Sequence, residues 1–175
     1  MKPLHIIIDG SDNLGKTTLL NSLSKQLDLP ILKMPNMKKY IKNGDVEEFS
    51  RLFNETIIQF AKYPFLMDRC YTSSLVYNEI FKRGGDMLYL EEIEQALDPI
   101  VIILTGRHKN AMDQSISYKS FCKDPIYNEE EKAKVDEEFC RLAKDRGYIL
   151  IEVIGKTPLK IFEEVMNEII ANQIL

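Results

Sequence analysis

Apolar residues along the chain form two kinds of pattern: short continuous runs, and longer stretches with a helical period. The short runs, typical of buried strands, lie at about residues 4–9, 31–34, 65–68, 100–104 and 148–153. Between and after them, stripes spaced three or four residues apart cover about residues 16–27, 46–60, 73–81, 88–97, 126–144 and 158–169. Strands that alternate with helices in this way predict an α/β fold, with a five-stranded parallel sheet sandwiched between helices.

The turn after the first run matches the phosphate-binding pattern G-x-x-x-x-G-K-[ST], from Gly10 to Thr17. Glycine allows backbone angles that let the loop's N–H groups face phosphate oxygens, and the next helix adds its positive N-terminal end. Lys16 supplies a cation for the β- and γ-phosphates, and the Thr17 hydroxyl is suited to Mg²⁺. The alternative is a plain glycine-containing turn, but the strand before it and the helix after it favour phosphate binding. The residues expected to bind ATP here are Gly10, Ser11, Asn13, Leu14, Gly15, Lys16, Thr17 and Thr18.

Length and composition narrow the class of protein. The 175 residues fit a single domain, 1–175, and the net charge of −4 is unfavourable for a dedicated nucleic-acid binder. No apolar run approaches the ~20 residues of a membrane span. Three widely spaced cysteines without a C-x-x-C pair suit reduced thiols, so we expect a cytoplasmic protein with no membrane and no stable nucleic-acid partner.

In a parallel sheet, ligands bind at the carboxyl ends of the strands. The predicted strand ends carry the phosphate-binding loop with Asp12, then Lys33 and Pro35, then Asp68 and Arg69. The fourth strand is followed by a polar segment, about residues 105–125, which begins with basic residues such as Arg107. A metal-nucleotide cradle, a carboxylate and facing cations are the parts that phosphoryl transfer requires.

Each of these features also has a simpler explanation. Asp68 and Arg69 could form a surface ion pair, Lys33 could be an ordinary exposed lysine, and residues 105–125 could be a plain surface loop. Position at the carboxyl edge favours a functional role for Asp68 and Arg69. Long segments without a periodic pattern in compact domains are often lids, so we predict a flexible lid at about residues 105–125.

Three stretches resemble thymidylate kinase and its relatives among the P-loop nucleoside and nucleotide kinases. Residues 9–18, Asp-Gly-Ser-Asp-Asn-Leu-Gly-Lys-Thr-Thr, are similar to the family's phosphate-binding loop with its additional aspartate. Residues 68–78, Asp-Arg-Cys-Tyr-Thr-Ser-Ser-Leu-Val-Tyr-Asn, resemble its Asp-Arg-aromatic, Ser, Ala-Tyr-Gln pattern. Residues 33–35, Lys-Met-Pro, stand where the family has Arg-x-Pro.

The resemblance implies roles for individual residues. Asp12 would bond the sugar 3′-hydroxyl, Arg69 would hold the acceptor phosphate, and Asp68 would organise Mg²⁺ with Thr17. The catalytic residues would be Lys16, Asp68, Arg69 and a cation of the lid, which would be Arg107, Lys109 or Lys119. The remaining substrate-binding residues would be Lys33, Pro35, Phe49, Phe53, Ser73, Tyr77 and Asn78, and Lys156 would border the adenine of ATP.

Taken together, these features predict a deoxynucleoside monophosphate kinase that uses ATP and Mg²⁺ to phosphorylate a pyrimidine deoxynucleotide such as dTMP. The alternative is a deoxynucleoside kinase, which needs a general base for a free 5′-hydroxyl. Such enzymes place a Glu where this chain has Met34, so the monophosphate is favoured. Lys33 in place of Arg and Asn78 in place of Gln leave the identity of the base open. We also expect a homodimer.

Overall fold

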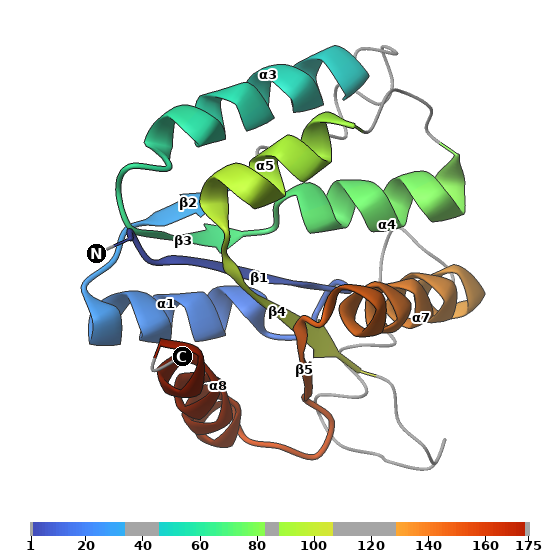
Figure 1. Cartoon of the computed structure of the whole chain (residues 1–175). Coiled ribbons are helices and arrows are strands. Elements are labelled where there is room, and N and C mark those ends of the chain that lie inside the picture. Colours follow the sequence, from blue (N-terminus) through green and yellow to red (C-terminus); the bar gives the residue numbers. More distant parts are fainter. Residues whose placement is uncertain (1, 34–45, 83–87, 107–128, 174–175) are drawn as a thin grey trace.

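A five-stranded parallel sheet forms the centre of the computed structural model, which describes residues 2–33, 46–82, 88–106 and 129–173 (Figure 1). Its strands are His5–Gly10 (β1), Ile31–Lys33 (β2), Phe65–Asp68 (β3), Ile100–Thr105 (β4) and Ile149–Glu152 (β5). They lie in the order β2-β3-β1-β4-β5, and every neighbouring pair is parallel. The predicted sheet is therefore confirmed, with β1 at its centre.

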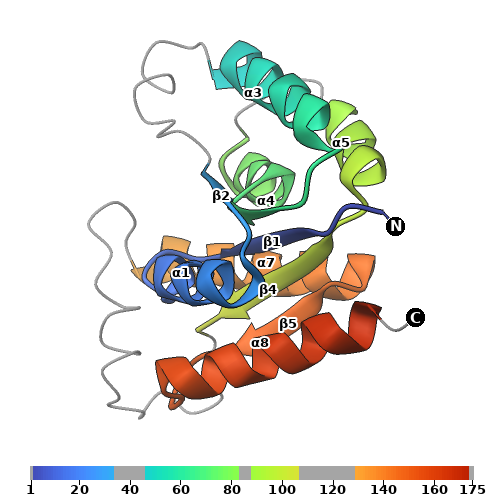
Figure 2. The same cartoon turned by 90° about the vertical axis from the view of Figure 1, so that its left-hand side faces the viewer.

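Helices cover both faces of this sheet (Figure 2). Those described are Lys16–Leu27 (α1), Val46–Phe60 (α3), Tyr71–Phe81 (α4), Tyr89–Leu97 (α5), Glu129–Arg146 (α7) and Pro158–Gln173 (α8). Helices α3, α4, α5 and α7 pack on one face, and α1 and α8 pack on the other. None of the helices in the described ranges is long and apolar enough to cross a membrane.

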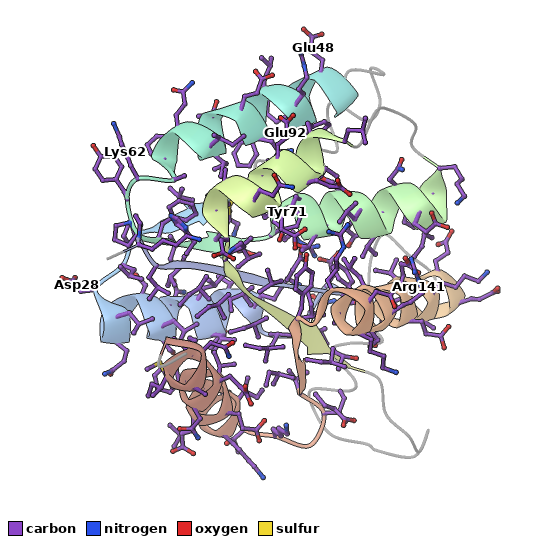
Figure 3. All side chains as sticks on the ribbon, in the orientation of Figure 1. Asp28, Glu48, Lys62, Tyr71, Glu92 and Arg141 are labelled. Atoms are coloured by element: carbon purple, nitrogen blue, oxygen red, sulfur yellow. The ribbon has the colours of Figure 1, made fainter. Side chains whose placement is uncertain are left out.

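The pleat of the strands divides the apolar side chains between two cores. Ile7 faces the core under α3, α4, α5 and α7, whereas Ile6 and Ile8 face the core under α1 and α8. Because β1 is buried on both faces, its sequence is a continuous apolar run rather than an alternating one. Figure 3 shows the contrast between Tyr71, which is fully buried among the helices, and Arg141, which projects from α7 into solvent.

Helix α4 begins at Tyr71, two residues before the predicted start at Ser73. The backbone N–H of Ser73 donates to the carbonyl of Cys70, so the helical turn already includes the residues directly after Arg69. This early start brings the side chains of α4 up to the end of β3.

The register brings the carboxyl ends of the strands to one edge. Ile8 of β1 pairs with Asp68 of β3, and Gly10 pairs with Leu104 of β4. A Cβ atom on Gly10 would lie 2.1 Å from the Leu104 carbonyl oxygen, so only glycine lets β1 approach β4 this closely. The edge therefore collects the loop after β1 and the residues after β3, as the sequence predicts.

Candidate functional site

The loop between β1 and α1 has the backbone that phosphate binding requires. Gly10, Asn13 and Gly15 all have positive φ, at 126°, 65° and 81°, conformations that glycine and asparagine tolerate best. Helix α1 starts directly after Gly15, so its first free N–H groups point toward the loop. Thr17 and Thr18 are solvent-exposed in this first turn. This geometry suits an anion, and phosphate in particular.

Lys16 lies in the middle of this loop with its side chain buried. Its Nζ donates to the carbonyl oxygens of Gly10 at 3.0 Å and Ser11 at 2.5 Å. Burial, and secondarily the nearby charge of Arg69, lower the pKa of Lys16 to about 7. An amino group beside two carbonyls, with a pKa near neutrality, can exchange these contacts for phosphate oxygens, which favour its charged form.

Asp9, at the end of β1, is completely buried and accepts hydrogen bonds from both sides of the site. Its donors are the Gly10 N–H at 2.8 Å, the Thr72 hydroxyl at 2.5 Å and the Ser73 hydroxyl at 2.8 Å. Arg69 lies 3.5 Å away as an ion pair. Asp9 therefore ties the phosphate-binding loop to the start of α4.

Arg69 contacts the phosphate-binding loop directly, as the meeting of strand ends predicts. Its guanidinium donates to Asp12, to the Ser73 hydroxyl at 3.0 Å and to the Tyr77 hydroxyl at 3.3 Å. Its backbone N–H donates to the Ile8 carbonyl at 3.2 Å, and its φ of 66° is unusual for a non-glycine residue. Burial opposes its charge, but Tyr77, Asp9 and Asp12 raise its pKa above the ordinary value, so Arg69 stays cationic.

Asp68 and Lys33 form an ion pair across the end of the sheet, 3.3 Å apart. They are register partners on adjacent strands, which accounts for their proximity. Asp68 is nearly buried, whereas the Lys33 side chain is 66% exposed, so the lysine can leave this pair at small cost.

Helices α3 and α4 supply the remaining predicted substrate residues. Phe49 and Phe53 are half-buried on α3, and Tyr77 of α4 lies under the guanidinium of Arg69, with Cζ 5.8 Å from the ring centroid. The Oδ1 atom of Asn78 is buried and accepts no hydrogen bond from the described residues. Such an acceptor costs stability unless a ligand or water satisfies it.

Asn54 of α3 was not among the predicted residues. It is 1% exposed, and neither its Oδ1 nor its Nδ2 has a hydrogen-bond partner within the described ranges. The sequence pattern places Asn54 outside the apolar stripe, but it lies three residues before Ile57, a helical spacing that brings it beside the buried face and is the signal that could have identified it.

Lys156 lies in the turn between β5 and α8, where its Nζ donates to Glu164 at 2.5 Å. Pro35, Arg107 and almost all of the predicted lid at 105–125 fall outside the described residues. The predictions for them stay predictions.

Asp136 of α7 is a further residue that sequence reasoning missed. It is 2% exposed, and its Oδ1 accepts from the Ser11 hydroxyl at 3.2 Å and from the Gly106 N–H at 3.2 Å. Its Oδ2 accepts from the Thr105 hydroxyl at 2.7 Å. A buried carboxylate of α7 thus reaches the phosphate-binding loop and the end of β4 together.

Comparison with solved structures finds this fold among the P-loop kinases. Thymidylate kinase from Candida albicans is similar with a TM-score of 0.63 at 18% identity, over 98% of this chain and 93% of that one. Deoxyadenosine kinase from M. mycoides gives 0.65 at 15% identity, over 96% and 100%. The YorR protein from Bacillus subtilis, solved with phosphorylated GDP, gives 0.66 at 17% identity, over 98% of both chains.

Comparison of the sequence alone finds no match. No protein-family model fits the chain, and no curated protein matches it significantly. The likeness therefore lies in the fold, and at that level it confirms the predicted resemblance to thymidylate kinase-like P-loop kinases.

Proposed function

We propose that this protein is an ATP-dependent nucleotide kinase that transfers the γ-phosphoryl group to a deoxynucleoside monophosphate, with a pyrimidine nucleotide such as dTMP as acceptor. The observation that carries the proposal is the contact between Arg69 and Asp12. It joins a cation suited to an acceptor phosphate to the loop suited to the donor phosphates, on adjacent strands of one sheet. Phosphoryl transfer depends mainly on this kind of positioning and on electrostatic stabilisation.

The chain's own cations would carry the electrostatic part. Lys16 would exchange its bonds to Gly10 and Ser11 for phosphate oxygens, and Arg69 would hold the acceptor phosphate while Asp12 turns to the acceptor's sugar. A guanidinium binds phosphate through two parallel hydrogen bonds, which fixes orientation as well as charge. Lys33, exposed beside Asp68, would add a second acceptor cation.

The oxygen ligands at the site fit Mg²⁺. Thr17 offers an exposed hydroxyl at the start of α1, and Asp68 offers a carboxylate at the end of β3. Mg²⁺ is typically held by one or two carboxylates together with substrate phosphates, so a single carboxylate beside a hydroxyl is a ligand set of the kind it uses. When bound, the ion would neutralise charge on the phosphates.

The side-chain amides of Asn54 and Asn78 support a heterocyclic base as part of the acceptor. The buried Oδ1 of each, and the Nδ2 of Asn54, lack partners among the described residues and are the acceptor and donor types that a base edge would satisfy. A deoxynucleoside kinase is the rival, and deoxyadenosine kinase is among proteins of similar fold. The monophosphate is preferred because it needs cations rather than a general base, and Arg69 and Lys33 are cations.

The test is a panel of nucleosides and nucleoside monophosphates incubated with Mg-ATP, with separation of the phosphorylated products. We expect a diphosphate product from a deoxynucleoside monophosphate. A phosphorylated free nucleoside would favour the rival, and ATP hydrolysis unaffected by any acceptor would overturn both.

Arg69→Ala tests the acceptor role of the guanidinium. We expect kcat/KM for the monophosphate to fall about a hundredfold or more, since a charge-stabilising donor is lost. Arg141→Ala is the matched control, because Arg141 is an exposed arginine that bonds only Glu138 and Asp145 among the described residues. Equal losses of kcat/KM in the two variants would contradict the assignment of Arg69 to the acceptor phosphate.

A further inference from the structure

Asp136 is a buried ionisable residue for which the proposed reaction has no direct use. It belongs to α7, 125 residues beyond Ser11 in sequence, yet Figure 1 shows α7 beside the turn between β1 and α1. Burying a carboxylate is costly unless several donors satisfy it, and Asp136 receives at least three. The fold thus places a buried, hydrogen-bonded carboxyl group against the phosphate-binding loop.

The contact determines how Ser11 is oriented. A carboxylate can only accept hydrogen bonds, so the Ser11 hydroxyl must donate toward Asp136. The carbonyl of the same residue accepts from Lys16 at 2.5 Å. Ser11 is therefore bonded to Asp136 through its side chain and to Lys16 through its carbonyl. When phosphate binds, Lys16 would give up the second bond, and the bond to Asp136 would remain.

Asp136 also bonds the Thr105 hydroxyl and the Gly106 N–H at the end of β4. These bonds fix the carboxylate against the central sheet rather than leaving it at the end of a mobile side chain. Hydrogen bonds to an ionised acceptor are roughly twice as strong as neutral ones. The Ser11 hydroxyl is consequently bonded to a carboxylate whose position is fixed by the end of β4.

We propose that Asp136 is a positioning residue for the phosphate-binding loop, which acts through Ser11 to set the affinity for the donor's phosphates. The inference rests on the proposed function in taking ATP as the donor. It differs from a purely structural role, in which Asp136 would only attach α7 to β4 through Thr105.

The hydrogen bonds of Asp136 to the phosphate-binding loop and to β4 can be removed separately. Ser11→Ala removes the hydroxyl on the loop, and Thr105→Val removes the hydroxyl on β4. Asp136→Asn preserves the shape and tests the charge, and is preferred to Asp136→Ala because it leaves no cavity. Calorimetric titration with Mg-ATP gives the affinity, steady-state kinetics give KM for donor and acceptor, and thermal unfolding gives stability.

We expect Ser11→Ala to weaken Mg-ATP binding about tenfold, the equivalent of one hydrogen bond to a charged group. The KM for the acceptor should stay within about twofold. A general loss of stability would not weaken donor binding while leaving the acceptor KM unchanged. Thr105→Val should lower the unfolding temperature and change ATP affinity much less. In a double-mutant cycle, Ser11→Ala and Asp136→Asn should be non-additive in ATP affinity.

Additive effects of Ser11→Ala and Asp136→Asn, or equal effects of Ser11→Ala and Thr105→Val on ATP affinity, would overturn the inference while the proposed function stands. Wild-type protein that binds no nucleotide would overturn the proposed function, and this inference with it. The same wild-type titration therefore separates the two failures.

Discussion

At the scale of single residues, the site is held together by Arg69. Its left-handed backbone conformation costs of the order of 1–3 kcal/mol in a non-glycine residue, and such strain gathers at functional sites. The strain is offset by side-chain bonds to Asp12, Ser73 and Tyr77. A strained backbone that turns this guanidinium toward the phosphate-binding loop supports the assignment of Arg69 as the acceptor cation.

The lowered pKa of Lys16 leads us to expect that ATP binding is accompanied by proton uptake. A pKa of about 7 means that the amine is mostly neutral at pH 8, whereas a triphosphate favours the charged form. Binding at pH 8 should therefore take up most of a proton, and binding at pH 6 much less. Calorimetric titrations in buffers with different ionisation enthalpies measure this number.

The control for proton uptake is Lys16→Met, which keeps an unbranched side chain one atom shorter and has no ionisable group. Any ATP that it binds should produce no uptake at pH 8. Uptake by the wild type that is equal at pH 6 and pH 8 would contradict the lowered pKa of Lys16.

At the scale of elements, the site depends on how closely β1 lies to β4. Gly10 occupies the point of contact, with φ of 126° and no space for a Cβ. Gly15 has a φ of 81°, but a Cβ added there would meet no atom within 4 Å among the described residues. Comparing substitutions at the two glycines therefore separates the effect of the close approach of β1 to β4 from the effect of the positive φ.

Gly10→Ala should lower the free energy of unfolding by about 3 kcal/mol or more, because the new methyl group would push β4 away from β1. Gly15→Ala should cost about 1 kcal/mol, the penalty for an L-residue with a left-handed backbone. Urea denaturation of the two variants provides the measurement. Similar losses of unfolding free energy in the two variants would mean that β4 can move away from β1 at little cost.

The presence of Asp12 and Arg69 at one edge of the sheet could be predicted from the sequence because it follows from a topological rule, whereas their direct contact also depends on the order of the strands. Two strands that are parallel neighbours end at one edge, whatever their distance along the chain. Asp136 could not be predicted in this way. It is one of many acidic residues on a charged helix, and only the packing of α7 distinguishes it from its exposed neighbours.

At the scale of the whole molecule, two apolar cores share one sheet. Phe139 belongs to the core under α7, and Leu23 belongs to the core under α1. Because the residues of β1 face both cores in alternation, neither core can lose its order without exposing the central strand. This arrangement supports the prediction of a single domain.

Phe139→Ala should lower stability by about 3–5 kcal/mol, and Leu23→Ala by about 2–5 kcal/mol. Both should shift one cooperative unfolding transition, seen at the same urea concentration by circular dichroism and by near-ultraviolet tyrosine absorbance. Two separated transitions, each sensitive to only one substitution, would contradict the single domain.

The order of the strands also divides the molecule into parts that can change independently. The loop proposed for the donor follows β1 and contacts β4 and α7. Apart from Asp12 of this loop, the residues proposed for the acceptor come from β2, β3, α3 and α4. The two halves meet in the backbone bond between Arg69 and Ile8 and in the side chains of Asp9 and Asp12. New acceptor specificity could therefore be engineered, or could evolve, by replacing side chains of α3 and α4 while the triphosphate site is inherited unchanged.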